Sequence, residues 1–399
     1  MDIKDLYAVS AKDADFSKAC FAPYAMGVDT GSNTKEQNLP LIAPRGSASA
    51  PIWVLIEEPI STDISAGYCF SGGMGHAFDK MLEEAKIDIH DVYIIARRPD
   101  TDEPRSYDSL ENKIERYKPP LILTVGEACF YWLKECNSNW RFALGKHVGS
   151  LLRSDNLSFS HYMMPIFGMD RLMADWAERN ITAYIDLGKV KDELDYYRVH
   201  GVLNPLRQRT LVCQELSTEL IIDRLDSFTR CKAVASDIET VYPRRKSEFY
   251  RKHPGEPIVI AFAISSDFSL SFSIWRETEQ ERLDLWKAMQ RVFDAVDIVI
   301  GQNFFNFDRL FLNMIGLYIP LYKIQDTLIR HHILWPELSH KLQFLTRQYT
   351  RQPFYKDEGR GWNRKDLTSL RHYNALDAAA TFEVYEAQEL EFKQRPQLR

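Results

Sequence analysis

The sequence has no long apolar run. Nowhere in its 399 residues do apolar side chains approach the roughly 18 in succession that a membrane-spanning helix needs. The opening segment, MDIKDLYAVSAKDADF, is too polar for a secretory signal peptide. These two absences argue against a membrane or secreted protein. We therefore expect a soluble, cytoplasmic chain with no membrane partner.

Cysteine motifs are also missing. The chain has six Cys residues, and they are scattered, with no C-x-x-C pair among them. In an intracellular protein this favours free, buried thiols over a disulfide framework. A metal or cluster site built on these cysteines is the less favoured alternative.

An excess of positive charge is the third absence. The formal net charge is −6, whereas a wide, nonspecific duplex-binding surface needs a strong positive balance. The charge leaves room for an enzyme that grips a few nucleotides through metal ions and a local groove. The sequence has no internal repeat or low-complexity tract, and its length favours two domains.

Strand and helix signals alternate through the first half of the chain, after a Gly/Ser/Pro/Asn-rich stretch that predicts a loop at 28–51. Such alternation predicts an α/β domain with a parallel sheet between helices, spanning residues 1–198. The expected strands lie at 51–57, 91–96, 121–125 and 161–167, and the expected helices at 75–85, 109–117, 127–136 and 170–180.

The second half, residues 199–399, begins differently. A connection with an edge strand at 199–212 and a helix at 215–228 precede three strand signals, at 233–240, 257–265 and 269–275. Their short connections predict an antiparallel meander. A helix at 281–295, a strand at 297–302, a helix at 307–316 and a strand at 322–326 follow. Three meander strands followed by strand–helix crossovers are typical of the ribonuclease H-like arrangement, a mixed-sheet α/β fold.

Two acids stand out on the first meander strand. Asp237 and Glu239 are two residues apart, so their side chains point to the same face of the strand. Their neighbours Ala235 and Ile238 are apolar, and burying paired acids is costly unless a cation joins them. Hard divalent ions such as Mg²⁺ or Mn²⁺ are natural partners of carboxylate oxygens. The alternative is that both acids point to solvent at a strand end.

Two further acids lie on expected helices. Asp308 opens a helix just after a strand, where an acid is commonly a cap or a partner of the helix dipole. Tyr373 and Asp377 are four residues apart on a long C-terminal helix and therefore share a face. Leu370, Ala380 and Val384 around them indicate that this face looks inward.

In order and spacing these motifs resemble a known family. D-x-E at 237–239, N-x-x-x-F-D at 303–308 and Y-x-x-x-D at 373–377 resemble the DEDD exonucleases of the tyrosine subclass, the proofreading module of family A and family B DNA polymerases. The resemblance covers about 208–399, and the stretch YTRQPFYKDEGRGW (349–362) is similar to that of phage DNA polymerases in particular.

The resemblance implies a role for each motif residue. Two divalent cations, Mg²⁺ or Mn²⁺, would be held by the four acids Asp237, Glu239, Asp308 and Asp377. The Tyr373 hydroxyl would orient the attacking water, and Thr240 and Asn303 would contact the terminal nucleotide. The implied activity is 3′→5′ removal of nucleotides from single-stranded DNA 3′ ends.

The resemblance also implies a setting. We expect a replicative proofreading subunit or fragment, encoded by a bacteriophage and acting in the host cytoplasm. Because no polymerase domain follows up to Arg399, a separately encoded DNA polymerase is the expected partner. Basic segments at 244–253 and 356–365 are candidates for phosphate contacts. The alternatives are an RNA-trimming or repair exonuclease of the same superfamily, and a non-catalytic replisome scaffold.

The first domain has a resemblance of its own. Its segments GYCFSGGMGHAFDKML (67–82), VLIEEP (54–59) and TVGEAC (124–129) resemble uracil-DNA glycosylases of the four-to-six-type families, over about residues 45–190. In that family an aromatic at the place of Phe70 stacks on the flipped uracil.

Several family positions are altered here. Cys69 replaces a proline, and Ile56 and Ile60 replace the glycines around Glu57 and Pro59. The family's asparagine aligns with Ala96, and Phe167 and Gly168 stand where its histidine is expected. We therefore expect a glycosylase fold without glycosylase activity, serving as a structural or partner-binding module, with Phe70 in the core.

Overall fold

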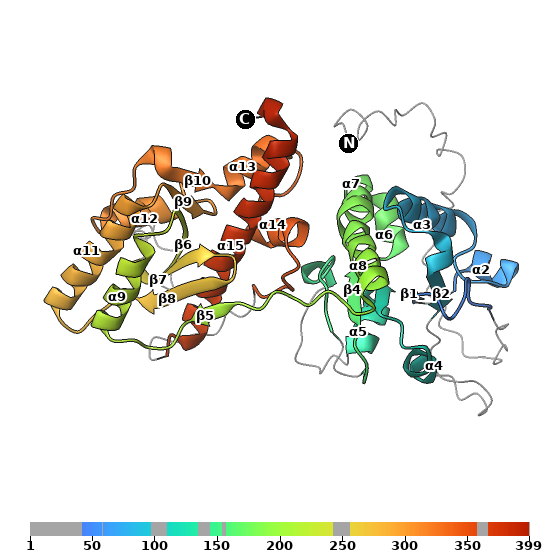
Figure 1. Cartoon of the computed structure of the whole chain (residues 1–399). Helices are drawn as coiled ribbons and strands as arrows, with labels where there is room; N and C mark the ends of the chain where they lie inside the picture. The colour runs from blue at the N-terminus through green and yellow to red at the C-terminus, as the bar shows by residue number, and fades with distance from the viewer. Residues whose placement is uncertain are drawn as a thin grey trace, which may run out of the picture. The chain divides into compact units, whose positions relative to one another are not determined.

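The computed structural model describes residues 42–57, 59–96, 110–134, 144–153, 157–241, 256–356 and 366–398. Most of the expected loop at 28–51, the basic segment 244–253 and residues 357–365 lie outside these ranges. The described residues contain two separate sheets (Figure 1).

The first sheet is parallel, as the alternation of strand and helix signals predicts. Its four strands are β1 (Ile52–Ile56), β2 (Val92–Ala96), β3 (Leu121–Val125) and β4 (Tyr162–Ile166), in the order β2-β1-β3-β4. Every position of β1, β3 and β4 is buried. Strands without a solvent-facing side require cover on both faces, which helices supply in α/β folds.

Helices follow each of these strands. They are α2 (Ser61–Ala66), α3 (Gly72–Glu84), α4 (Leu110–Tyr117), α5 (Glu127–Lys134), α6 (Met169–Ala174), α7 (Trp176–Ile181) and α8 (Leu187–His200). The sequence prediction missed α2 and α8. In α8 the buried Leu187, Val190 and Leu194 have helical spacing, but the polar residues between them obscure it. The proposed domain boundary at residue 198 falls in the last turn of α8 and stays a prediction.

The second sheet is mixed and has the predicted ribonuclease H-like order. Strands β6 (Ala233–Val241), β7 (Glu256–Ser265) and β8 (Phe268–Ser273) form the antiparallel meander. Strands β9 (Ile298–Gly301) and β10 (Ile324–Asp326) continue it in parallel beyond β6, and β5 (Thr210–Val212) pairs with β8 at the far edge. The full order is β10-β9-β6-β7-β8-β5.

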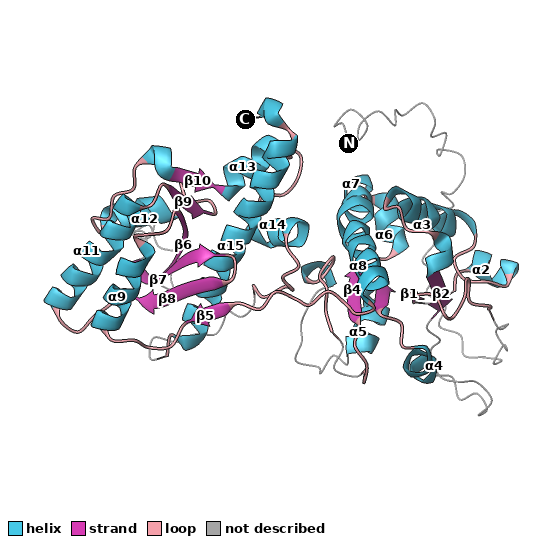
Figure 2. Ribbon diagram, viewed as in Figure 1, coloured by secondary structure: helices cyan, strands magenta, loops and turns pink. Residues whose placement is uncertain are grey.

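Helices pack on both faces of this mixed sheet (Figure 2). The apolar side chains of α9 (Thr218–Phe228) and α11 (Glu279–Ala295) pack with Val234 and Ile238 of β6. The long helix α15 (Thr368–Gln394) packs on the other face, with Ala235. Because strand side chains alternate, Asp237 and Glu239 point to the face of Ala235, toward α15. The shorter helices α12 (Asp308–Met314), α13 (Thr327–Leu334) and α14 (Leu342–Tyr349) complete the domain.

Small side chains line the contact between α15 and the sheet. Ala378 and Ala379 of the helix pack against Ala235, Ala261 and Ala263 of the strands, all fully buried. Because these five side chains are single methyl groups, the helix backbone lies close to the sheet here. This close approach carries the helix residues next to these alanines, Asp377 among them, to the surface of β6.

Two expectations from composition can be compared with the fold. Four cysteines are free thiols, as predicted; Cys69 and Cys129 are buried, but Cys213 and Cys231 are only half-buried, and the other two lie outside the described residues. Within the described ranges, no helix has the length and apolarity needed to cross a bilayer.

Candidate metal centre

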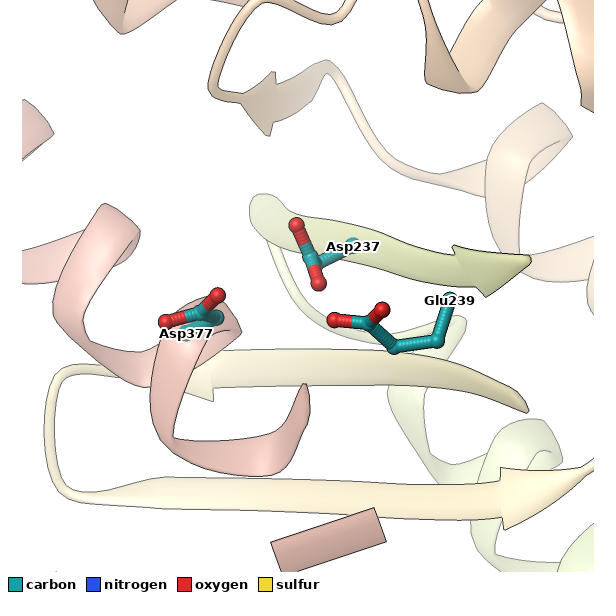
Figure 3. A group of neighbouring side chains, drawn as sticks. All are labelled: Asp237, Glu239 and Asp377. Carbon is teal, nitrogen blue, oxygen red and sulfur yellow. The ribbon is translucent and has the colours of Figure 1, made fainter. Parts of the chain in front are cut away.

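Three predicted acids meet between strand β6 and helix α15. One carboxylate oxygen from each of Asp237, Glu239 and Asp377 lies within 4.8 Å of the others. Figure 3 shows Asp237 and Glu239 extending from the strand toward the helix that carries Asp377. Asp377 is far from Asp237 and Glu239 in sequence, so it is the packing of α15 on the sheet that creates the cluster.

The fourth acid, Asp308, lies beside this group rather than within it. It is the first residue of α12 and is buried, with 3% of its surface exposed. Its Oδ1 accepts a hydrogen bond of 3.0 Å from the backbone N–H of Ile238, which lies between Asp237 and Glu239. Asp308 is therefore attached to the same strand segment as the first two acids.

A turn held by Asp326 presents Asp308 to the strand. The buried Asp326 carboxylate accepts backbone hydrogen bonds from Asn303 at 2.9 Å and Phe305 at 3.2 Å, and it also caps α13 through Leu328 N–H at 3.0 Å. At Gly301 a Cβ atom would lie 2.2 Å from the Phe304 ring, so only glycine allows the chain to fold back this tightly. The sequence pattern indicates a strand–helix junction here, but it does not reveal this role of Asp326.

Asn374 is a site residue that the sequence analysis missed. It follows Tyr373 on α15 and is fully buried. Its side-chain amide donates to Asp237 Oδ2 at 2.7 Å and to the Asp237 carbonyl at 3.1 Å, while its own Oδ1 accepts from Ser271 Oγ at 2.8 Å. A clue was available, because Asn374 is three residues before Asp377 and therefore lies near it on the helix.

Lys356 is a second residue whose position the sequence could not give. Its Nζ lies 2.6 Å from both carboxylate oxygens of Asp377 and donates to the Tyr373 hydroxyl at 3.1 Å. In the sequence, Lys356 is one of several basic residues at 356–365 that are candidates for phosphate contacts. Tyr373 itself lies near Asp377, as the Y-x-x-x-D spacing predicts.

Burial and mutual repulsion shape the electrostatics of the acids. Burial, and then the neighbouring Asp377, raise the pKa of Asp237 to about 8, while Lys356 and Asn374 oppose the rise. Burial followed by the charge of Asp237 raises the pKa of Glu239 to about 9. The pKa of Asp308 is also well above its ordinary value, for the same two reasons. Acids held this way favour a cation in their midst, and an all-oxygen donor set suits Mg²⁺ or Mn²⁺.

The two residues expected to contact the nucleotide are in different surroundings. Thr240 is buried beside a register irregularity of β6, and its hydroxyl has no hydrogen-bond partner among the described residues. Asn303 is half-buried with a left-handed backbone (φ 58°), and its Oδ1 accepts from the Asn306 side chain at 3.3 Å. Their contact with a nucleotide stays a prediction.

At the parallel sheet, a carboxylate of the chain itself occupies one helix start. The carboxyl ends of such strands form the usual ligand crevice of α/β folds. Here Glu57, just after β1, accepts a 2.8 Å hydrogen bond from Ala128 N–H in the first turn of α5. At Gly126 (φ 90°) a Cβ would lie 2.4 Å from the same carboxylate oxygen. The Glu57 side chain thus occupies the helix N-terminus that could otherwise receive a ligand.

Phe70 is part of the core, as predicted. Only 7% of its surface is exposed, and its ring centroid lies 5.2 Å from that of Phe78. Cys69 beside it is buried as well.

Comparison with known families agrees with the sequence reading of the parallel-sheet domain. The sequence model of the uracil DNA glycosylase superfamily matches residues 43–185. That is less than half of the chain, and it leaves the mixed-sheet domain outside the match. No curated protein matches the chain.

The solved structures that are similar to this chain include the following three. The catalytic core of RRP6 from Trypanosoma brucei is 14% identical (TM-score 0.38), over 49% of this chain and 52% of that one. The Nibbler EXO domain of Aedes aegypti is 19% identical (TM-score 0.39), over 48% of this chain and 94% of that one. RNase D of Escherichia coli, an exoribonuclease involved in structured RNA processing, is 12% identical (TM-score 0.37), over 48% of this chain and 47% of that one. The matched parts thus span about half of the RRP6 and RNase D chains.

Proposed function

We propose that this chain is a metal-dependent 3′→5′ exonuclease that shortens single-stranded DNA from its 3′ end. The observation that carries the proposal is the convergence of Asp237, Glu239 and Asp377, whose carboxylate oxygens lie within 4.8 Å of one another. Asp308 completes the set through its hydrogen bond to Ile238 N–H. Four acids around one strand segment, two of them buried and two half-buried, are costly in a folded protein unless cations neutralise them.

The acids would hold two divalent ions, Mg²⁺ or Mn²⁺, which supply the positive charge that activates water and stabilises the leaving oxygen in phosphodiester hydrolysis. Asp237 clusters with Asp377 and its charge also raises the pKa of Asp308, which suits it to serve both ions. Asn374 fixes the orientation of the Asp237 carboxylate, as outer partners of ligating carboxylates commonly do.

Tyr373 would position the attacking water through its hydroxyl. Burial, and then the charge of Asp377, raise the pKa of Tyr373 above its ordinary value. At neutral pH the side chain is therefore a neutral phenol and acts through hydrogen bonds. It would orient water next to Asp377 without providing a charge or a metal ligand.

The parallel-sheet domain would have a structural or partner-binding role. Glu57 at the start of α5 and Phe70 in the core both support the absence of glycosylase chemistry. We propose a separately encoded DNA polymerase, of phage origin like this chain, as the partner that delivers 3′ ends. The support is the similarity of the exonuclease motifs to proofreading modules. Co-purification with a polymerase of the same genome tests this part.

Substrate class and polarity are tested together by one assay. Single-stranded DNA and RNA of the same sequence, labelled at the 5′ end or at the 3′ end, are digested over time with Mg²⁺ or Mn²⁺. The proposal predicts a descending ladder from 5′-labelled DNA and immediate release of the label from 3′-labelled DNA. Faster digestion of RNA would instead favour an RNA-trimming enzyme, and uniform internal cleavage would contradict exonuclease action.

A further inference from the structure

The ammonium group of Lys356 lies in a pocket suited to a cation. Besides its two 2.6 Å contacts with Asp377, its Nζ is 5.0 Å from the ring centroid of Tyr373 and 5.2 Å from that of Tyr355. Aromatic faces at such distances attract a positive charge. The Lys356 side chain is only 20% exposed and Tyr355 only 3%, so water screens these interactions weakly.

Lys356 supplies a positive charge next to the acids of the metal centre. The centre holds four acids, Asp237, Glu239, Asp308 and Asp377. Among the described residues, the ion pair of Lys356 with Asp377 is the one ion pair that any of these four acids makes. Like-charged buried groups repel each other. In the metal-free protein this ammonium therefore offsets part of the repulsion.

The contacts of Lys356 are incompatible with a metal ion on the same oxygens. A divalent ion binds carboxylate oxygens at about 2.0–2.6 Å. The lysine nitrogen already stands 2.6 Å from each Asp377 oxygen, so an ion there would face a second cation at close range. A lysine side chain has four flexible methylene groups and can move away.

We propose that Lys356 is a built-in counter-cation: it holds Asp377 in place in the metal-free protein and withdraws when a divalent ion takes the same oxygens. This proposal rests on the proposed function, because it assigns the ion to the same acids. The metal affinity of the site is then a competition between the ion and the chain's own lysine. The metal-free fold, in turn, depends on Lys356 for stability.

The variant Lys356→Met separates these two effects. Methionine keeps an unbranched apolar stem between the two tyrosine rings and removes the charge. Without the competitor, Mn²⁺ should bind about tenfold or more tightly, the scale set by a lost charged hydrogen bond. The metal-free variant should melt about 2–4 °C lower than the wild type, and Mn²⁺ should remove that difference. The matched control is Lys287→Met, since Lys287 is a 68% exposed lysine on α11.

Calorimetric titration of Mn²⁺ into the metal-free full-length chain measures the affinity. Tighter binding by Lys356→Met, with Lys287→Met equal to wild type, supports the proposal. Equal binding by all three proteins overturns the role of Lys356 and leaves the proposed function standing. Failure of wild type and Lys356→Met alike to bind Mn²⁺ overturns the proposed function and this proposal with it.

Acetylation of lysine amines, followed by mass spectrometry, observes the withdrawal itself. Lys356 should react slowly in the metal-free wild type and several-fold faster when Mn²⁺ is present. In the variant Asp377→Asn, whose neutral side chain no longer pairs with the ammonium, Lys356 should react fast with or without Mn²⁺. Lys287 serves as the internal reference in every sample. Equal reactivity of wild-type Lys356 with and without Mn²⁺ would show that the amine does not move, and would overturn the proposal.

Discussion

Asn374 of helix α15 donates its side-chain amide to the carboxylate of Asp237 on strand β6, at 2.7 Å. The same amide group is fixed by Ser271 of β8, whose hydroxyl donates a hydrogen bond to Asn374 Oδ1 at 2.8 Å. The helix that brings Asp377 to the site thus also fixes the first acid on the strand. A residue outside the four acids therefore sets the geometry of the proposed metal centre.

We predict that Asn374→Ala lowers kcat by about 10–100-fold, the usual cost of losing an outer partner of a ligating group. The Asp237 carboxylate loses its orienting donor, so the variant should also bind Mn²⁺ more weakly. Steady-state digestion of single-stranded DNA and calorimetry measure the two effects. Gln388→Ala is the control, because Gln388 is a buried amide on the same helix that donates to Thr327 O at 3.0 Å. Equal activities of the two variants would show that the contact with Asp237 has no catalytic effect.

Tyr373→Phe should slow digestion while leaving metal binding unchanged. An orienting hydroxyl contributes about 10²–10⁴-fold to a rate, and it is not one of the proposed ligands. Single-turnover digestion gives the rate, and Mn²⁺ titration gives the affinity. Tyr385→Phe removes a hydroxyl from the same helix outside the acid cluster and should keep the wild-type rate. An unchanged rate in Tyr373→Phe would remove the tyrosine from the mechanism.

The parts of this site that the sequence reveals are those with a regular spacing. Asp237 and Glu239 are two apart on a strand, and Tyr373 and Asp377 are four apart on a helix, so each spacing places its two side chains on one face. The strand and helix signals also predicted both sheets and the antiparallel meander. These features depend on short-range patterns, which the sequence contains directly.

Asn374 and Lys356 show what such patterns do not contain. A polar residue inside a helix looks the same in sequence whether it faces water or a buried carboxylate. Lys356 lies outside any helix or strand, where no period indicates a direction. Its partner Asp377 is known only once the segment after α14 folds back onto α15. Helix α8 was missed for a related reason, since polar residues separate its buried positions.

The protein should release no uracil from uracil-containing DNA. The Glu57 carboxylate occupies the start of α5, and Phe70 is packed against Phe78, so neither is available to a flipped base. Chromatography of free uracil after incubation with a single-stranded substrate measures the activity. The assay uses the Asp237→Ala variant, because its lack of nuclease activity leaves the DNA substrate intact. Free uracil that disappears in a further Phe70→Ala variant would mean that this domain is an active glycosylase.

Acid should weaken the fold through His331. This fully buried ring contacts His340 at 2.7 Å and Gln348 at 2.9 Å, and burial lowers its pKa from 6.5 to about 4. The unfolded chain binds a proton near pH 6.5 that the folded chain takes up only near pH 4. The contribution of the neutral His331 ring to the free energy of unfolding is therefore complete above pH 6.5. It is lost as the pH falls from 6.5 toward 4.

Denaturant unfolding at pH 7 and pH 5 tests this linkage. The wild type should lose about 2 kcal/mol more than His331→Gln between the two pH values, because the variant has no proton to gain there. The comparison uses the change with pH within each protein, so an overall loss of stability in the variant does not affect it. The same pH dependence in both proteins would exclude His331 as the source.

The most direct test of the central claim is a timed digestion of 5′-labelled single-stranded DNA by the wild type, Asp237→Ala and Asp377→Ala. Asp284→Ala on α11 is the matched control, since the Asp284 side chain is 44% exposed. The account predicts 3′ shortening by the wild type and the control with Mg²⁺ or Mn²⁺, and none with a chelator. Neither site variant should digest the DNA, although Asp237→Ala should fold as stably as the metal-free wild type, because one repelling charge is gone. Digestion at the wild-type rate by a folded Asp237→Ala or Asp377→Ala protein would contradict the account.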